Sequence, residues 1–165
     1  MRTIGYDVGD GRVFMGPQVL TMPMVDKRVA MKTMGVTMVV NLWWRRDDQI
    51  ASLVEHYRHV PVPDGKLSDA HLAHFDVLAR VSARHLNEGG VVLTQCQGGR
   101  NRSGVVAALT LCYWLGISGA EAVDRVRAGR GPGALSNRHF ASWLSSLPIN
   151  AASLADSSSL GAVPS

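Results

Sequence analysis

The stretch VVLTQCQGGRNRSGVVAALTLCYWLG, residues 91–116, decides the fold of this chain. It begins with an apolar, β-branched run, which is typical of a strand buried on both faces of a sheet. It ends with residues 103–116, which are apolar almost all round and therefore predict a central buried helix. A strand, a short loop and a helix in this order place the loop at the C-terminal edge of the sheet, where open α/β folds bind ligands.

The loop between them has the residue types of an anion site. Gly98 and Gly99 lack a Cβ, so the backbone can wrap closely and its N–H groups can join those of the first helical turn. Arg102 lies six positions after Cys96, and its planar fork matches two oxygens of a phosphate. The same positive field favours Cys96 as a thiolate, the form that attacks phosphorus. A cysteine packed as a small hydrophobe is the alternative, but the agreement of glycines, arginine, strand and helix favours the nucleophile.

The rest of the chain alternates strands and helices. Strands are expected at residues 13–15, 36–42 and 58–63, and helices at 24–35, 48–57, 68–89, 118–129 and 137–147. This alternation predicts an α/β fold in which helices flank a central, mainly parallel twisted sheet, in a single domain. We expect residues 1–148 to form that catalytic domain, and residues 149–165, which are small and polar, to form a disordered tail.

The composition is that of an ordinary globular domain, with 46% hydrophobic and 18% charged residues in a chain of 165. The net charge of +4 suits an anionic substrate, but lysine and arginine do not cluster in the stripe that nucleic-acid binders use. Cys96 and Cys112 give no disulfide framework, which favours the cytoplasm, and Cys112 falls within the apolar helix as a core residue. No apolar run approaches the roughly 18–20 residues of a membrane span. We expect a cytoplasmic monomer that inserts into no membrane and needs no metal or cofactor.

The loop resembles the signature of a known family. The pattern C-x5-R-S, here Cys96, Arg102 and Ser103, resembles that of the cysteine-based protein tyrosine phosphatases. Gly99 and Gly104 make it most similar to the dual-specificity subgroup. The likeness extends over nearly the whole domain and includes four further segments. The resemblance covers roughly residues 11–147. The four segments are VFMGP (13–17), VTMVVNL (36–42) with Asn41, VPVPD (60–64) and GRGPGALSNRHFASWL (129–144) with Arg130, Asn137 and Phe140.

The resemblance implies a phosphatase that hydrolyses phosphotyrosine and phosphoserine or phosphothreonine in proteins through a phosphocysteine. In that reaction Cys96 attacks phosphorus, Arg102 and the loop amides hold the phosphate oxygens, and Ser103 stabilises the departing thiolate. A carboxyl group must protonate the leaving oxygen. The phosphate-binding loop comprises Gln97, Gly98, Gly99, Arg100 and Asn101, and the supporting residues are Gln95, Asn41 and Asn137.

The position of Asp64 in VPVPD resembles that of the family's general acid. It lies 32 positions before Cys96, on a segment rich in proline and glycine. Asp69 and Asp76 are the competitors, but Asp69 falls in the first turn of an expected helix, where it complements the helix dipole, and Asp76 lies further in. The alternative for Asp64 is a plain turn residue, since Pro-Asp-Gly is common in turns.

Gln95 departs from the family pattern, which has histidine before the nucleophile. Glutamine donates a hydrogen bond but carries no charge, so we expect a less stabilised thiolate and a lower rate, with a phosphate-binding pseudophosphatase as an alternative. Arg100 is either a solvated surface residue or a second contact to a highly charged substrate. A phosphoinositide, another phospholipid phosphate or an RNA 5′-triphosphate therefore stays an alternative substrate. The residues WWRR at 43–46 follow a strand and either rim the site, to receive an aromatic or lipid group, or divide between core and solvent.

Overall fold

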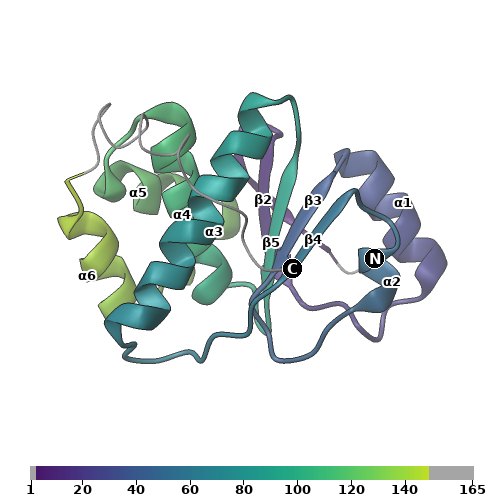
Figure 1. Cartoon of the computed structure of the whole chain (residues 1–165), viewed down its shortest axis with the longest axis horizontal. Helices are drawn as coiled ribbons and strands as arrows, with labels where there is room; N and C mark the ends of the chain where they lie inside the picture. The colour runs from purple at the N-terminus through teal and green to yellow at the C-terminus, as the bar shows by residue number, and fades with distance from the viewer. Residues whose placement is uncertain (1–2, 149–165) are drawn as a thin grey trace.

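The computed structural model describes residues 3–148, and the expected tail at 149–165 lies outside the described residues. Within the described part, six helices flank a five-stranded sheet whose strand order is β1-β2-β5-β3-β4 (Figure 1). The strands are β1 (Tyr6–Gly9), β2 (Val13–Pro17), β3 (Met38–Asn41), β4 (His56–His59) and β5 (Val92–Cys96). The helices are α1 (Met24–Met34), α2 (Asp48–Ala51), α3 (Asp69–Asn87), α4 (Arg102–Leu115), α5 (Gly119–Arg130) and α6 (Arg138–Ser146).

The sheet is mixed but mainly parallel, which confirms the expected fold class. β1 and β2 form an antiparallel hairpin whose turn contains Asp10 and Gly11, with positive φ angles of 54° and 70°. β2, β5, β3 and β4 pair in parallel, so their C-terminal ends lie along one edge. β5 is the central strand, and it carries Cys96 to the middle of that edge.

Side chains of β5 alternate between two hydrophobic cores. Val92 and Cys96 belong to the core that α3, α4, α5 and α6 cover, whereas Leu93 belongs to the core beneath α1 and α2. Figure 1 shows these two groups of helices on opposite sides of the sheet. Because both faces of β5 are buried, its sequence is apolar without interruption up to Thr94.

The helix α4 is the centre of the larger core. Residues 102–113 are all buried, as the apolar sequence predicts. α3 packs along α4, and α6 closes the same core with Phe140, whose ring meets Phe75 of α3 edge to face at 5.7 Å. Gly116, with a φ of 69°, ends α4 in a left-handed cap. A helix buried along most of its length holds its first turn, and with it Arg102, in a fixed position next to β5.

The expected helix at residues 48–57 and strand at residues 58–63 are wrong in their boundaries. α2 is only four residues long, and β4 already begins at His56 and ends at His59. β4 pairs in parallel with β3 along its whole length. The hydrogen-bonding partners that β3 offers outweigh a weak local preference for helix, and the sequence around residue 56 does not reveal those partners.

Candidate active site

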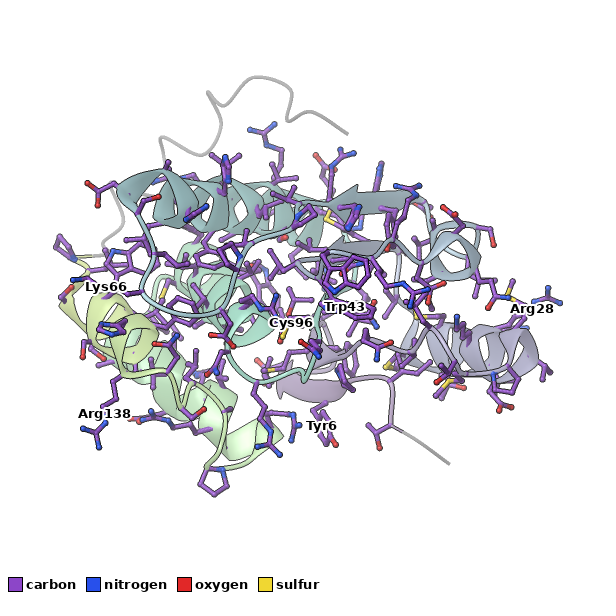
Figure 2. The ribbon with its side chains drawn as sticks, turned by 90° about the horizontal axis from the view of Figure 1, so that it is seen from below. Tyr6, Arg28, Trp43, Lys66, Cys96 and Arg138 are labelled. Carbon is purple, nitrogen blue, oxygen red and sulfur yellow. The ribbon has the colours of Figure 1, made fainter. Side chains whose placement is uncertain are left out.

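The candidate phosphate loop lies at the C-terminal edge of the sheet, between β5 and α4. Cys96 is the last residue of β5 and Arg102 is the first residue of α4. Figure 2 views the molecule from this edge and shows Cys96 near its middle. The loops after β2, β3 and β4 leave the sheet at the same edge, because these strands are parallel to β5 or to its neighbour. Residues that are distant in the sequence therefore surround Cys96.

The two glycines of the loop differ in what they contribute. Gly99 has a φ of 60°, and a Cβ there would overlap the backbone of Gly16 and Pro17 at the end of β2. Only glycine fits at that position, because any side chain would push the loop away from the sheet. A Cβ at Gly98 would meet nothing within 4 Å. Packing within the chain therefore requires glycine at position 99 but not at position 98.

The carbonyl groups of the loop are bound by elements around it. The Gly99 carbonyl accepts a hydrogen bond from Arg130 Nε at 2.9 Å, and the Arg100 carbonyl accepts one from the Leu135 N–H at 3.0 Å. These bonds turn the carbonyl oxygens outward, toward the end of α5 and the segment before α6. Backbone N–H groups that converge at the start of a helix then form a concavity suited to an anion.

Cys96 and Ser103 are both buried and face each other. The Cys96 Sγ and Ser103 Oγ atoms lie 3.3 Å apart, a distance at which the hydroxyl can donate to a thiolate. Thr94 holds Ser103 in place, because its own hydroxyl donates to the Ser103 carbonyl at 2.9 Å. Sequence reasoning identified Cys96 and Ser103 but missed Thr94. The signal that could have found it is the alternation along β5, which puts Thr94 and Cys96 on the same face.

Arg102 has only part of its guanidinium group engaged. The side chain is buried, and its Nη1 donates to the Val62 carbonyl at 2.9 Å. Its Nε is also buried and has no hydrogen-bond partner among the described residues. A buried, charged N–H without an acceptor is costly, and a phosphate oxygen in the loop would satisfy it. Arg102 thus combines a fixed position with a donor for which residues 3–148 provide no acceptor.

Asp64 reaches the phosphate loop from the segment after β4. Its Oδ2 accepts from Asn101 Nδ2 at 3.2 Å, and its Oδ1 accepts from Asn137 Nδ2 at 3.1 Å. The two competing aspartates lie elsewhere. Asp69 is in the first turn of α3, and Asp76 bonds to side chains of α3 and α4. Of the three candidates, the structure brings Asp64 to the loop.

Asn101 connects three segments of the site, a role that sequence reasoning did not find. Its Oδ1 accepts from the Asn137 N–H at 2.9 Å and from the Ser136 hydroxyl at 3.3 Å, while its Nδ2 donates to Asp64. Asn137 also donates to the Gly65 carbonyl at 3.1 Å. The two asparagines therefore join the phosphate loop, the Asp64 segment and the start of α6. No local pattern reveals such a network, because Asn101 and Asp64 are 37 positions apart.

Comparison with solved structures identifies the fold. Human DUSP28 is 26% identical, with a TM-score of 0.70 over 87% of this chain and 92% of that chain. Tk-PTP is 25% identical, with a TM-score of 0.69 over 88% and 98% of the two chains. Cydia pomonella PTP-2 phosphatase is 19% identical, with a TM-score of 0.72 over 87% and 89%. The chain has the fold of the dual-specificity and protein tyrosine phosphatases. No family model and no curated protein sequence matches it.

Gln95 lies at the base of the loop of this phosphatase fold. Its side chain is buried, and the side-chain Nε2 donates to the Pro17 carbonyl at 3.2 Å. The backbone carbonyl of Gln95 accepts from the Leu42 N–H at 2.8 Å. Because side chains alternate along β5, that of Gln95 points away from the face that holds Cys96. Gln95 therefore ties β5 to the ends of β2 and β3 directly beneath Cys96.

Asn41 shapes the loop that follows β3. Its Oδ1 accepts from the Trp43 N–H at 2.9 Å, and its Nδ2 donates to the Arg45 carbonyl at 2.9 Å and to the Tyr57 hydroxyl at 2.8 Å. Trp43 is 7% exposed and Trp44 is 69% exposed. The Arg45 guanidinium carbon lies 5.9 Å and 5.6 Å from the centres of the two rings. The WWRR segment thus divides, with one indole in the core and the other in solvent beside an arginine.

The second cysteine and the remaining acidic and histidine side chains do not add to the site. Burial in α4 raises the pKa of the Cys112 thiol to about 12, which keeps it protonated and unreactive. Among residues 3–148, histidine, cysteine, aspartate and glutamate side chains nowhere gather in threes as metal ligands would. In the same part of the chain, each helix is too short or too polar to cross a bilayer.

Proposed function

We propose that this chain is a protein phosphatase that hydrolyses phosphotyrosine and phosphoserine or phosphothreonine through a phosphocysteine. The observation that carries the proposal is the contact of Cys96 Sγ with Ser103 Oγ, at 3.3 Å, together with the buried Nε of Arg102, which has no hydrogen-bond partner among residues 3–148. A nucleophile, a hydroxyl donor for it and a free cationic donor then belong to one loop. The structural neighbours, human DUSP28 and Tk-PTP among them, support the phosphatase activity in this proposal.

In the first step, the Cys96 thiolate attacks phosphorus on the side opposite the ester oxygen. A sulfur–phosphorus bond forms while the phosphorus–oxygen ester bond breaks, and protonated Asp64 gives its proton to the leaving oxygen. Arg102 and the loop N–H groups stabilise the charge on the three remaining phosphate oxygens. The dephosphorylated tyrosine, serine or threonine leaves with a neutral hydroxyl group.

In the second step, water hydrolyses the phosphocysteine. The Asp64 carboxylate takes a proton from the water molecule as the water oxygen attacks phosphorus, and the sulfur–phosphorus bond breaks. Ser103, whose Oγ lies 3.3 Å from Sγ, donates a hydrogen bond to the sulfur as it departs as a thiolate. Inorganic phosphate is released, and Cys96 and Asp64 return to their starting protonation states.

Hydrolysis of p-nitrophenyl phosphate by the full-length chain tests this proposal. Cys96→Ser should abolish turnover, whereas Cys112→Ala, the matched control, should retain it because that thiol lies in the core and not in the loop. Vanadate, a phosphate analogue, should inhibit both the wild type and Cys112→Ala. Turnover that survives in Cys96→Ser would contradict the phosphocysteine. If the wild type binds vanadate but shows no turnover, the chain is instead a phosphate-binding pseudophosphatase, the alternative suggested by glutamine in place of histidine at position 95.

A phosphorylated lipid is the second candidate substrate, and the exposed indole of Trp44 beside Arg45 favours it. Indole and guanidinium groups suit the boundary between lipid headgroups and water. A panel of phosphopeptides, phosphoinositide vesicles and triphosphorylated RNA separates the candidates by kcat/KM. If kcat/KM is highest with phosphopeptides, the result supports a protein substrate. Faster hydrolysis of vesicles that is lost in Trp44→Ala would transfer the proposal to lipids.

A further inference from the structure

A pocket of about 320 Å³ opens beside the phosphate loop. It lies between the start of β1, the segment after β2 and Gln97, which directly follows Cys96. The pocket is lined by Gln97, the first residue of the loop, whereas Asp64 contacts Asn101, its last residue. Figure 2 shows Tyr6, one wall of the pocket, on the same edge of the molecule as Cys96.

The walls of the pocket are bonded to the phosphate loop. The Arg130 guanidinium lies over the Tyr6 ring, 4.1 Å from its centre, and the same side chain donates to the Gly99 carbonyl at 2.9 Å. On the other wall, the Gln18 N–H donates to the Cys96 carbonyl at 2.8 Å. The position of the pocket relative to the loop is therefore set by the fold and does not depend on a ligand.

The lining of the pocket is neutral. Thr3, Thr21 and Gln97 contribute uncharged polar groups, Met22 and Val19 contribute apolar ones, and among residues 3–148 no lining residue carries a charge. The volume is at the lower end of the roughly 300–1,000 Å³ typical of ligand pockets, which leaves room for a single amino-acid side chain. A second phosphate or another charged group would lose part of its hydration there, and none of the described lining residues offers it an opposite charge. The pocket is thus complementary to an uncharged group that lies next to a bound phosphate.

We propose that this pocket binds the uncharged side chain of a residue adjacent to the phosphorylated residue of a substrate peptide. The inference rests on the proposed protein phosphatase function and adds a specificity site to it. Consecutive Cα atoms of a peptide are about 3.8 Å apart. In phosphoserine and phosphothreonine the phosphate lies close to the backbone, so a peptide whose phosphoryl group occupies the loop brings a neighbouring side chain within reach of Gln97. A neighbour that is acidic or basic is disfavoured by the neutral lining.

Phosphoserine peptides that differ only in the residue before or after the phosphoserine test the proposal. Dissociation constants are measured on full-length Cys96→Ser, which should bind these peptides without hydrolysing them, and kcat/KM is measured on the wild type. At one of the two positions, threonine, valine or leucine should give about tenfold tighter binding and about tenfold higher kcat/KM than aspartate or lysine. Equal values for neutral and charged neighbours at both positions would overturn the proposal.

A variant that fills the pocket provides the second test. Thr21→Trp places an indole among the lining residues and should remove most of the roughly tenfold preference for a neutral neighbour. Thr33→Trp is the matched control, because Thr33 is exposed on α1 and does not line the pocket, and it should keep the full preference. If Thr21→Trp leaves the preference for a neutral neighbour unchanged, that preference arises at another surface, and the proposal is overturned.

The binding and turnover measurements separate this inference from the proposed function. If the wild type hydrolyses no substrate, the phosphatase proposal is rejected. If Cys96→Ser nevertheless binds peptides with a neutral neighbour most tightly, the pocket is supported as a peptide site. Turnover of p-nitrophenyl phosphate and of every peptide at equal rates would support the phosphatase and reject the pocket. A phosphoinositide vesicle that binds more tightly than every peptide would also overturn the peptide assignment.

Discussion

Two amide groups hold the Asp64 carboxylate at the edge of the phosphate loop, one from Asn101 and one from Asn137. Each carboxylate oxygen accepts one of these bonds, so both the position and the orientation of the carboxyl group are set by neighbouring side chains. A general acid works only where it can reach the leaving oxygen. The roles of Asp64 and Asn101 can therefore be separated by substrates that need a proton and substrates that do not.

Asp64→Asn should lower kcat for a phosphoserine peptide by about 10²–10⁴-fold, because the leaving alkoxide then receives no proton. The loss with p-nitrophenyl phosphate should be smaller, since p-nitrophenolate leaves readily without protonation. Steady-state kinetics on both substrates measure the difference. Asp69→Asn, in the first turn of α3, is the control and should keep the wild-type kcat. An equal loss in the two variants would contradict the assignment of Asp64.

Asn101→Ala should lower kcat for a phosphoserine peptide by about 10–100-fold, because Asp64 loses one of its two donors and moves from its working position. The same variant should affect p-nitrophenyl phosphate less, since Arg102 and the loop N–H groups stay in place. The ratio of the two kcat losses is the measurement. If both substrates lose the same factor, the substitution has damaged the loop itself and the positioning role is wrong.

At the scale of elements, the end of α3 packs against the segment before β3 through His85. The ring is buried, its Nε2 lies 2.7 Å from Thr37 Oγ1, and it meets the His56 ring edge to face at 5.1 Å. Burial lowers the pKa of His85, and the positive charge that His56 can carry lowers it further. The fold therefore holds the neutral ring, whereas the unfolded chain binds a proton with the ordinary pKa of about 6.5.

The free energy of unfolding should accordingly fall as the pH is lowered through about 6.5 toward the lower pKa of His85 in the folded chain. Below pH 6.5 the unfolded chain takes up more protons than the folded one, which stabilises the unfolded state. Urea denaturation between pH 7.5 and pH 5.5 measures the slope. His85→Gln should flatten it, and His139→Gln, at an exposed position of α6, should not. If the free energy of unfolding has the same pH slope in wild type and His85→Gln, protonation of His85 is not the cause of that slope.

The helices and strands also show where the local sequence predicts secondary structure correctly and where it does not. α3 and α4 occupy the segments that their apolar patterns predict, because each pattern matches the face that the helix buries. The segment from Asp48 to His59 contains a short helix and a strand that the sequence does not separate correctly. There the parallel pairing of β4 with β3 determines the boundary, and that pairing involves residues almost twenty positions earlier.

At the scale of the whole molecule, one edge of the sheet collects the site. β2, β5, β3 and β4 all end there, so the segments after them surround Cys96. The segment after β2 lines the neutral pocket, the one after β3 carries Trp43, and the one after β4 carries Asp64. The parallel arrangement thus brings a candidate nucleophile, a candidate acid and a candidate specificity pocket to a single loop of five residues between Cys96 and Arg102.

The sequence by itself determines the unit at residues 91–116 and, through it, the class of fold. The apolar run of β5, the apolar surface of α4 and the spacing of Cys96 and Arg102 are properties of neighbouring residues, and steric and hydrophobic rules act on them directly. The glycine at position 99 belongs to the same group, although the reason for it, the backbone of Gly16 and Pro17, appears only in the fold.

Only the tertiary structure decided how the site is completed. The bonds of Asp64 to Asn101 and Asn137 join residues 37 and 73 positions apart, and the pocket beside Gln97 joins three separate segments. The burial of Trp43 and the exposure of Trp44 likewise depend on what packs over the loop after β3. The physical reason is the same in each case. These contacts are set by the packing of helices on both faces of the sheet, and no short stretch of sequence contains that information.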